Sequence, residues 1–336
     1  MNQSKTKVPC SLILPIPPIV FEVGLNHLGD ALRARRMIDA LAKSGATHMT
    51  LQVVTDPVGI TRDPSAITFL REAALPIDDV HALLAYASDN GLVAGATVLD
   101  PDDVPGLVEA GARIFKILSS DLTYVPLILA AARTGYPTYL STAAAKLDEI
   151  EEVLAIVREE IPLADLRIIH TVLEIPTPIA HINLRNITML REPFGIPVAY
   201  GQHSDVREAL LVAAVLGADA LFVYVAEERT ESLPDGPHAV LCPEVAALLE
   251  SVRRAVRTLG SAQRVDDPEA ESLRRRIRRS AVAIRPLVAG HVVTRADIVF
   301  RRPGTGVEPY HVDRILGRTL PHAVAAGDNL PMHDSP

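Results

Sequence analysis

Short apolar runs rich in β-branched residues recur along most of the chain, and amphipathic stretches separate them. Each run is nearly continuous in hydrophobicity, which is typical of a strand that is buried on both faces. The pattern predicts eight such strands, at Ile19–Val23, His48–Val54, Leu92–Leu99, Ile114–Leu118, Pro137–Leu140, Leu166–His170, Pro197–Tyr200 and Ala220–Val225.

The stretches between these runs have the spacing of amphipathic helices, and several end at a glycine, as helix C-caps do. Strand–helix alternation repeated eight times predicts a parallel sheet that closes into a (β/α)8 TIM barrel. A doubly wound open sheet is the alternative. No G-x-G-x-x-G motif follows the first strand, however, so a dinucleotide-binding half is not supported. The clearest predicted helices are Ala31–Ser44, Asp78–Asn90, Asp102–Ala110, Lys146–Glu159 and Asp205–Leu216.

The composition and the pattern of the sequence change after the helix predicted at Pro243–Thr258. Residues 260–279 are polar and charged, and we interpret them as a linker whose run of arginines is a solvated face. Beyond it, short strands are predicted at Ser280–Ile284, Gly290–Thr294 and Asp297–Phe300. The sequence therefore predicts a barrel domain over residues 1–259, a linker over 260–279 and a small β-rich domain over 280–336.

Composition and charge narrow the class of protein. The 336 residues suit a barrel of about 250 residues plus a smaller unit. The net charge of −8 leaves no excess of cations to neutralise phosphates, which argues against a nucleic-acid partner. The two cysteines, Cys10 and Cys242, exclude a disulfide framework and fit a reducing compartment. Prolines interrupt the apolar N-terminal stretch and no window approaches a membrane span, so we expect a cytoplasmic protein without a membrane partner.

Polar side chains gather where the predicted strands end, and in a barrel the carboxyl ends of the strands carry the chemistry. A lone Thr or Ser there is better interpreted as the start of a loop. Glu22 and Lys116 are different, because they are charged and flanked by apolar residues, and burying such groups is costly unless they are paired or bind something. An inward cation, a carboxylate and several hydroxyls suit a small phosphorylated or carboxylated ligand. The polar strand-end residues are Glu22, Thr50, Gln52, Thr97, Lys116, Ser119, Ser141, Thr142, His170, Gln202, His203 and Tyr224.

Several ordered motifs resemble those of the N-acetylneuraminate (sialic acid) synthase family. Residues 21–30 read FEVGLNHLGD, similar to the family's E-[IV]-G-x-N-H-x-G-D opening, and residues 115–121 read FKILSSD, similar to F-K-I-x-S-G-[DE]. Leu140–Thr142 matches the start of L-S-T-G-M, and residues 170–178 resemble H-C-T-x-x-Y-P-[TA]-P. Residues 301–307, RRPGTGV, resemble the R-P-G-x-G-[IV] signature of the antifreeze-like (SAF) domain. The motifs run from about residue 19 to the C-terminus.

The resemblance implies a barrel that condenses phosphoenolpyruvate with an aldehyde sugar such as N-acetylmannosamine to a 2-keto acid, using a divalent metal, Mn or Mg. It also implies a domain-swapped homodimer in which the SAF domain of one subunit caps the other's barrel and contributes an arginine. By their positions in the motifs, the catalytic residues would be Glu22, Gln52 and Lys116. The small-molecule substrates would be bound by Asn26, His27, Thr97, Ser119, Asp121, Ser141, Thr142, Gln202, Tyr224 and Arg302, and the metal by His203.

The chain departs from the family pattern at the reacting centre. Thr50 stands where the family's V-K-x-Q motif has a lysine, so one ligand-binding cation is missing. The seventh strand ends in YGQHS instead of Y-S-D-H-T, which places Gln202 where the family has an aspartate. Tyr224 stands where the family has its second metal histidine. The predicted metal site is therefore incomplete, because one imidazole holds a divalent cation only weakly.

Other residues could compensate for these losses. His238, with Glu227 or Glu228, lies just beyond the eighth strand and could replace the missing ligands. Alternatively, hydrogen-bond donors such as Tyr224, Gln202 and Lys116 could take over part of the metal's role in polarising a carbonyl group.

Three functions stay open on the sequence. The first is a divergent synthase of this family with altered substrate or metal use. The second is an aldolase, lyase or isomerase that does not use phosphoenolpyruvate, in which Lys116 acts as a binding cation or forms a Schiff base. The third is a catalytically silent binding or regulatory member. The enzyme hypotheses are favoured, because a silent barrel gains nothing from an inward lysine and glutamate that cost folding energy.

Overall fold

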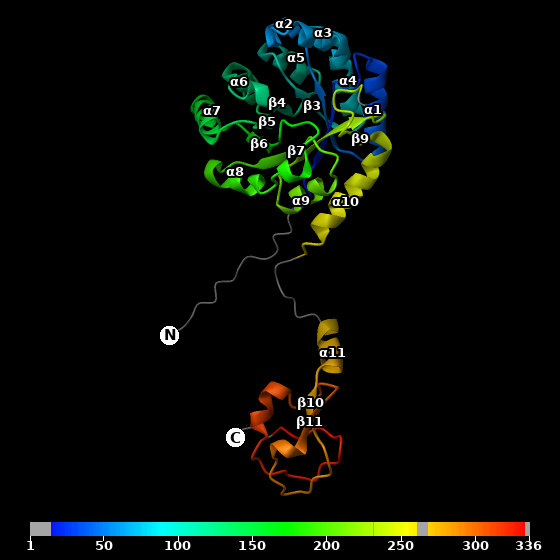
Figure 1. The fold of residues 1–336 in the computed structure, drawn as a ribbon, viewed down its shortest axis with the longest axis vertical. Helices are drawn as coiled ribbons and strands as arrows, with labels where there is room; N and C mark the ends of the chain where they lie inside the picture. The colour runs from blue at the N-terminus through cyan, green and yellow to red at the C-terminus, as the bar shows by residue number, and fades with distance from the viewer. Residues whose placement is uncertain (1–14, 231, 261–267, 333–336) are drawn as a thin grey trace. The chain divides into compact units, whose positions relative to one another are not determined.

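The computed structural model describes residues 15–230, 232–260 and 268–332, which fall into two compact units. The first unit, within Met1–Ser261, contains a closed parallel barrel, and the second, within Ala262–Pro336, contains a small antiparallel sheet (Figure 1). No helix among the described residues is long and apolar enough to cross a membrane.

The strands of the first unit pair in chain order, and β8 pairs back onto β1. The predicted (β/α)8 barrel is therefore confirmed, and the alternative of an open, doubly wound sheet is wrong. The predicted strand centres hold, and the ends shift by one or two residues. The strands are β1 (Ile19–Gly24), β2 (His48–Gln52), β3 (Val93–Thr97), β4 (Phe115–Ile117), β5 (Thr138–Ser141), β6 (Leu166–His170), β7 (Val198–Gln202), β8 (Leu221–Ala226) and the short β9 (Val240–Leu241), which pairs with β8.

Helices surround the barrel and bury their apolar faces against it (Figure 1). The first of them shows how local sequence sets the boundaries: Asp30 accepts hydrogen bonds from the backbone N–H groups of Leu32 and Arg33, and Gly45 ends the helix in the left-handed conformation. The helices are α1 (Ala31–Ser44), α2 (Pro57–Ile60), α3 (Pro64–Ala73), α4 (Ile77–Asp89), α5 (Val104–Glu109), α6 (Val125–Ala132), α7 (Leu147–Glu160), α8 (Asn186–Phe194), α9 (Glu208–Val215) and α10 (Val245–Arg257).

A separate apolar cluster fills the inside of the barrel. Gly95 of β3 lies so close to β4 that a Cβ atom there would sit 2.8 Å from the Ile114 side chain. Side chains from six of the strands and their first flanking residues meet in this interior, so the barrel is a packed core and not a pore. The cluster consists of Val20, Ile114, Tyr139, Ile169, Ala199, Ala220 and Phe222. Polar residues can therefore face a shared space only above this layer, at the carboxyl ends of the strands.

The second unit has its own apolar core beneath two antiparallel strands, β10 (Ser280–Ala283) and β11 (Ile298–Arg301). The strand predicted at Gly290–Thr294 is wrong: this segment makes an isolated bridge from Val292 to Thr319, because turns at both of its ends prevent a longer ladder. The stretch interpreted as a linker contains α11 (Pro268–Ile277), which carries most of the arginine run on a largely exposed surface.

Candidate functional site

The register of the barrel brings the predicted site residues to one level at its carboxyl end. Glu22 of β1 lies opposite Tyr224 of β8 in the sheet. In the next strands of the sheet, Thr97 of β3 lies between Gln52 of β2 and Lys116 of β4. We call this end of the barrel, above the apolar cluster, the mouth.

A buried ion pair crosses the mouth. The Nζ of Lys116 donates to Oε2 of Glu22, and each residue is only 3% exposed. Nζ also lies 5.5 Å from the ring centroids of both Phe222 and Tyr224. Removing two charges from water costs several kcal/mol per ion, which the mutual attraction offsets only in good geometry. The pair therefore joins β1 to β4 directly at the centre of the predicted site.

Neutral aromatic groups line the mouth beside this pair. The Nδ1 of His203, just after β7, lies 2.7 Å from the Val172 carbonyl oxygen, and its ring centroid is 5.9 Å from that of Tyr224. Burial lowers the pKa of His203, so this imidazole is neutral at pH 7. Burial, with a smaller effect of the Glu22 carboxylate, raises the pKa of Tyr224 well above its ordinary value. The tyrosine hydroxyl thus keeps its proton and can donate a hydrogen bond.

Asp235, which the sequence analysis did not single out, also reaches the mouth. It lies on the loop between β8 and β9, and burial, followed by the Glu22 carboxylate, raises its pKa to about 7, against the opposing effect of Lys116. The Nε2 of His238 is 3.7 Å from Oδ1 of Asp235, and burial lowers the pKa of His238 to about 3. In the sequence, the signal was a Pro-Asp-Gly-Pro-His run at residues 234–238, in the loop after the eighth strand, and this run is typical of an ordinary turn.

Four of the predicted binding residues hold the loops of the mouth in place. Asn26 donates to the Val225 carbonyl oxygen, and Thr142 donates to that of Ile169. Gln202 donates to carbonyl oxygens of its own loop, and its Oε1 has no partner among the described residues. The Nδ1 of His27 accepts from the Gly29 N–H, and burial lowers the His27 pKa to about 4. The hydrogen bonds of these four residues hold the backbone around the site in place.

The remaining barrel residues of the predicted set form a rim of hydroxyl and carboxyl groups. Ser141 and Thr97 are buried at the ends of their strands. Ser119, in a turn of 3₁₀ helix after β4, accepts from the Ala143 N–H, which ties the β4 and β5 loops together. Asp121 in the same turn is half-buried, and this burial raises its pKa.

Arg302 belongs to the second unit, on a loop that several contacts brace. The hydroxyl of Ser280 donates to the Pro303 carbonyl oxygen and accepts from the Gly306 N–H. A Cβ atom on Gly306 would sit 2.7 Å from the Asn329 side chain, which would then have to move. Arg302 is exposed and makes no hydrogen bond or ion pair with the described residues. A rigid loop thus presents a free guanidinium group.

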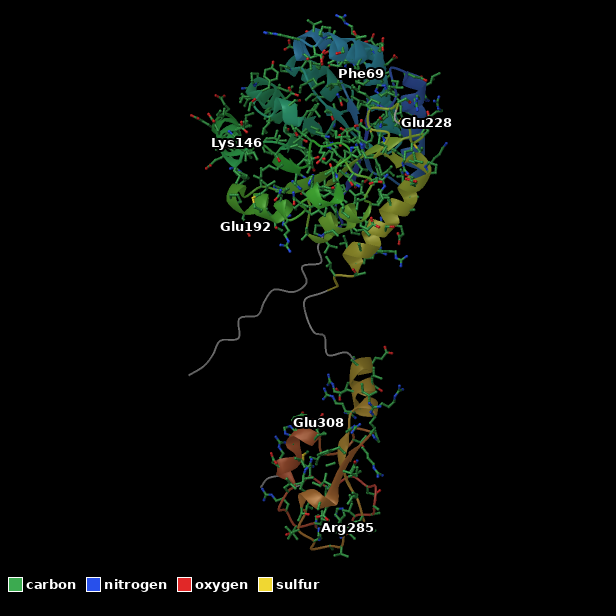
Figure 2. The ribbon with its side chains drawn as sticks, in the orientation of Figure 1. Phe69, Lys146, Glu192, Glu228, Arg285 and Glu308 are labelled. Atoms are coloured by element: carbon green, nitrogen blue, oxygen red, sulfur yellow. The ribbon has the colours of Figure 1, made fainter. Side chains whose placement is uncertain are left out.

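The described side chains of the mouth do not form a complete set of ligands for a divalent metal. Glu227 and Glu228 could have replaced the missing ligands, but they pair with Arg33 and Arg36 of α1. Glu228, labelled in Figure 2, lies at the edge of the barrel unit. Within residues 15–230, 232–260 and 268–332, no three His, Cys, Asp or Glu side chains are placed to hold a metal ion.

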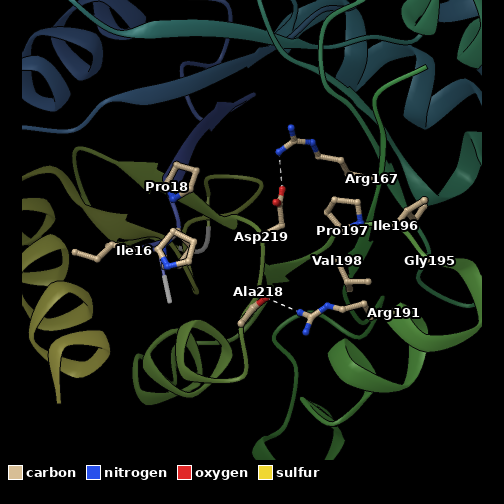
Figure 3. A pocket seen from close by; sticks show the side chains of 13 residues that line it. Ile16, Pro18, Arg167, Arg191, Gly195, Ile196, Pro197, Val198, Ala218 and Asp219 are labelled. Atoms are coloured by element: carbon tan, nitrogen blue, oxygen red, sulfur yellow. Dashed lines mark hydrogen bonds and ion pairs between the residues drawn. The ribbon is translucent and has the colours of Figure 1, made fainter. Parts of the chain in front are cut away.

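A cavity of about 670 Å³ opens at the opposite end of the barrel, where β7 and β8 begin (Figure 3). Its two arginines are already engaged: Arg167 pairs with Asp219, and Arg191 donates to the Gly217 carbonyl oxygen. Polar groups at this end of a barrel serve stability. We therefore place the candidate functional site at the mouth, where the charged and neutral donors converge.

The buried ion pair makes a prediction for stability. Glu22→Gln or Lys116→Met leaves one buried charge without its partner, and we expect each to lower the free energy of unfolding by about 3–5 kcal/mol. The double variant should lose much less than the sum, because it leaves no unpaired charge. Urea denaturation at pH 7 measures both effects, with Arg133→Met as a control at an exposed ion pair. Additive losses would contradict the coupling.

Asp235 makes a prediction for pH dependence. Its carboxyl faces Glu22, Lys116, Tyr224 and His238. An aspartate that titrates near 3.8 when unfolded and near 7 when folded loses stability as the pH rises between these values, because the folded state holds the proton longer. Asp235→Asn cannot ionise, so above pH 7 it should be more stable than the wild type by about 2–4 kcal/mol.

Thermal denaturation of both proteins between pH 4.5 and 8.5 tests this expectation. The advantage of Asp235→Asn should shrink steadily toward the acid end. A difference between the two proteins that stays constant over this range would show that the Asp235 pKa is not raised.

Comparison with known proteins identifies the family of this chain. Residues 37–264 match the NeuB family and residues 278–334 match the SAF domain. An uncharacterized protein of Methanocaldococcus jannaschii is 30% identical over 302 residues, which cover 90% of this chain and 89% of that one. The N,N'-diacetyllegionaminic acid synthase of Legionella pneumophila is 26% identical, over 93% of this chain and 92% of that one. The crystal structure of N-acetylneuraminic acid synthetase from Leptospira borgpetersenii superposes with a TM-score of 0.71 at 26% identity, covering 76% and 90% of the two chains. The predicted resemblance is thus confirmed: the chain belongs to the NeuB family of sialic-acid-type synthases and carries a C-terminal SAF domain.

Proposed function

We propose that this chain is a carbon–carbon bond-forming synthase that condenses phosphoenolpyruvate with an aldehyde sugar to give a 2-keto acid. The observation that carries the proposal is the buried Glu22–Lys116 pair, set among hydroxyl groups at the carboxyl ends of the barrel strands. The names of two relatives, a legionaminic acid synthase and an N-acetylneuraminic acid synthetase, support this class of reaction.

The residues of the mouth suit the charge changes of such a condensation. C3 of phosphoenolpyruvate bonds to the aldehyde carbon, the aldehyde oxygen takes up a proton, and water replaces the phosphate at C2. Lys116 and the protonated Tyr224 hydroxyl can donate to the oxygen on which negative charge develops. Once Lys116 turns to the substrate, Glu22 is free to hold a proton. The hydroxyls of Thr97, Ser119 and Ser141 can donate to phosphate oxygens.

The barrel unit needs additional positive charge for an anionic substrate, because Glu22 already pairs with Lys116. The second unit has that charge: residues 262–336 contain 12 arginines against nine acidic residues. The exposed, unpaired Arg302 is the candidate, and in our proposal it acts on the barrel of a second copy in a domain-swapped homodimer.

A second candidate function is an aldolase or lyase that does not use phosphoenolpyruvate. The ion pair between Lys116 and Glu22 favours it, since a mouth without an unpaired positive charge disfavours binding of a trianion. Titration calorimetry of phosphoenolpyruvate separates the two candidates: tight binding supports the synthase, and no binding supports the alternative.

Phosphate release tests the proposed reaction. The purified protein, phosphoenolpyruvate and a panel of aldoses that includes N-acetylmannosamine should yield inorganic phosphate and one equivalent of a 2-keto acid, detected by mass spectrometry. Lys116→Met should lower kcat/KM by about 100- to 1,000-fold, as loss of a preorganised donor does, whereas Arg133→Met should not. EDTA should leave the rate within about twofold, because the donor set does not fit a metal. No phosphate with any aldose would refute the synthase.

Mixing of inactive variants tests whether Arg302 acts across subunits. Arg302→Ala and Lys116→Met each damage one part of the proposed site, and each should be inactive alone. If the arginine comes from the second copy, subunit exchange creates one intact site in each mixed dimer, which restores about a quarter of the wild-type activity. Inactive mixtures, despite mixed dimers seen by native mass spectrometry, would place Arg302 outside the site of its partner.

A further inference from the structure

The cavity at the end of the barrel opposite the mouth has rigid and mostly apolar walls. Ile16, Ile196 and Val198 line it together with four prolines (Figure 3). A proline ring fixes its own φ angle, so walls of this kind change shape little. The volume of about 670 Å³ lies within the range of about 300–1,000 Å³ that is usual for small-molecule sites. The cavity is therefore large enough and firm enough to hold a small molecule. The prolines are Pro15, Pro17, Pro18 and Pro197.

Both arginines of the cavity make hydrogen bonds to the protein, but they differ in how many donors these bonds use. The Nε and Nη2 of Arg167 each donate to a carboxylate oxygen of Asp165. Its Nη1 donates to Asp219 and to the hydroxyl of Tyr139. Two carboxylates thus neutralise this guanidinium group, and the network serves the stability of the barrel.

Arg191 has no carboxylate partner among the residues that the structure describes. It stands in the last turn of α8, and its Nη2 donates to the Gly217 carbonyl oxygen, which leaves most of its five N–H donors unused. Gly195 ends α8 in the left-handed conformation, so the chain turns at once into the cavity wall. The Arg191 side chain is half-buried, and Figure 3 shows its guanidinium group beside Ala218. The cavity thus holds one positive charge that is fixed in place but not neutralised.

The surroundings of this charge select the kind of ligand. A carboxylate accepts two parallel N–H bonds from a guanidinium group and balances its single charge. A phosphate dianion fits less well, because Asp219 lines the same cavity and repels additional negative charge. The apolar walls favour a hydrocarbon body attached to the carboxylate. Residues 1–14 contain two lysines and no Asp or Glu, so the segment before Pro15 offers no carboxylate side chain to Arg191.

We propose that this cavity is a second binding site, which takes a small monocarboxylate with an apolar body, and that Arg191 binds the carboxylate. The proposal does not rest on the synthase reaction, since the cavity shares no residue with the mouth. β7 and β8 begin at the cavity and end at the mouth. A ligand in the cavity therefore does not touch the reacting atoms, which is the position of an effector and not of a substrate.

Fluorine NMR measures binding to the unmodified full-length chain. The probe is 4-fluorophenylacetate, and the comparison ligands are its uncharged amide and inorganic phosphate, which is followed by competition with the probe. The acid should bind saturably and at least about tenfold more tightly than the amide or phosphate, because only the acid combines a single negative charge with an apolar body.

A tryptophan placed in the wall locates the bound probe. The chain has no tryptophan, and Ile16 lines the cavity with 42% of its surface exposed. Ile16→Trp therefore adds a single fluorophore at the cavity without disturbing the core. Its emission should change with the same dissociation constant for the probe that fluorine NMR gives.

Arg191→Gln removes the positive charge but keeps an N–H donor for the Gly217 carbonyl oxygen, so the fold should be retained. It should weaken binding of the acid by about 10- to 100-fold, since the charge-assisted hydrogen bonds are lost, and leave binding of the amide unchanged. Arg158→Gln is the matched control: Arg158 also donates to a backbone carbonyl oxygen, that of Phe194, but does not line the cavity. It should bind the acid within about twofold of the wild type. Circular dichroism melts of both variants check that they are folded.

Four results would overturn the proposal. The unmodified chain does not bind the acid at millimolar concentration, or it binds the amide equally well. Arg191→Gln, folded as the wild type is, binds the acid with unchanged affinity. The probe binds but leaves the emission of Ile16→Trp unchanged, which would place it outside the cavity. None of these results bears on the synthase reaction, which phosphate release tests separately.

Discussion

The mouth of this barrel is organised by one buried ion pair between Glu22 and Lys116, which join the first strand to the fourth. Neither charge could stay there alone, because an unpaired ion in a nearly dry interior costs several kcal/mol. Three kinds of side chain surround the pair. An apolar layer with Phe222 lies below it, and the neutral Tyr224 ring lies beside it. Strand ends that carry hydroxyl groups form the rim. The pair connects β1 to β4 and places a carboxylate and an ammonium group at the mouth.

The two histidines and the tyrosine of the mouth are uncharged at pH 7. Burial lowers the pKa values of His203 and His238 and raises that of Tyr224, so uncharged donors and acceptors surround the pair. A polarised carbonyl group requires donors that are already in position, and such groups supply them. In the proposed synthase, the substitutions that separate this chain from the family pattern, Tyr224 and Gln202 among them, would change how a carbonyl group is polarised, while the barrel keeps its eight paired strands.

Asp235 is a buried group whose ionised form costs stability. The loop holds a carboxyl where its ionised form is unfavourable, which raises its pKa to about 7. Natural proteins tolerate such costs mainly at sites that bind or react.

The sequence by itself determined the barrel and most of the residues at its mouth. Eight doubly buried strands, read from continuous apolar runs, specify a closed parallel sheet, and the residue that follows each run is then at the mouth by necessity. Glu22 and Lys116 were predictable for this reason, and the motifs added the family. The C-terminal unit was harder, since Gly290–Thr294 has strand-like composition but too few cross-strand bonds to form a strand.

Only the tertiary structure decided which of these residues meet and which are already occupied. Glu22 and Lys116 lie 94 positions apart, and their pairing depends on the register of strands that no local pattern fixes. Asn26 and Gln202 look like ligand contacts in the sequence, yet their amides hold neighbouring backbone. Asp235 looks like part of a turn, yet a fold-back loop carries it into the mouth. Burial and partner choice are properties of the packed chain, because each depends on atoms contributed by segments far away in the sequence.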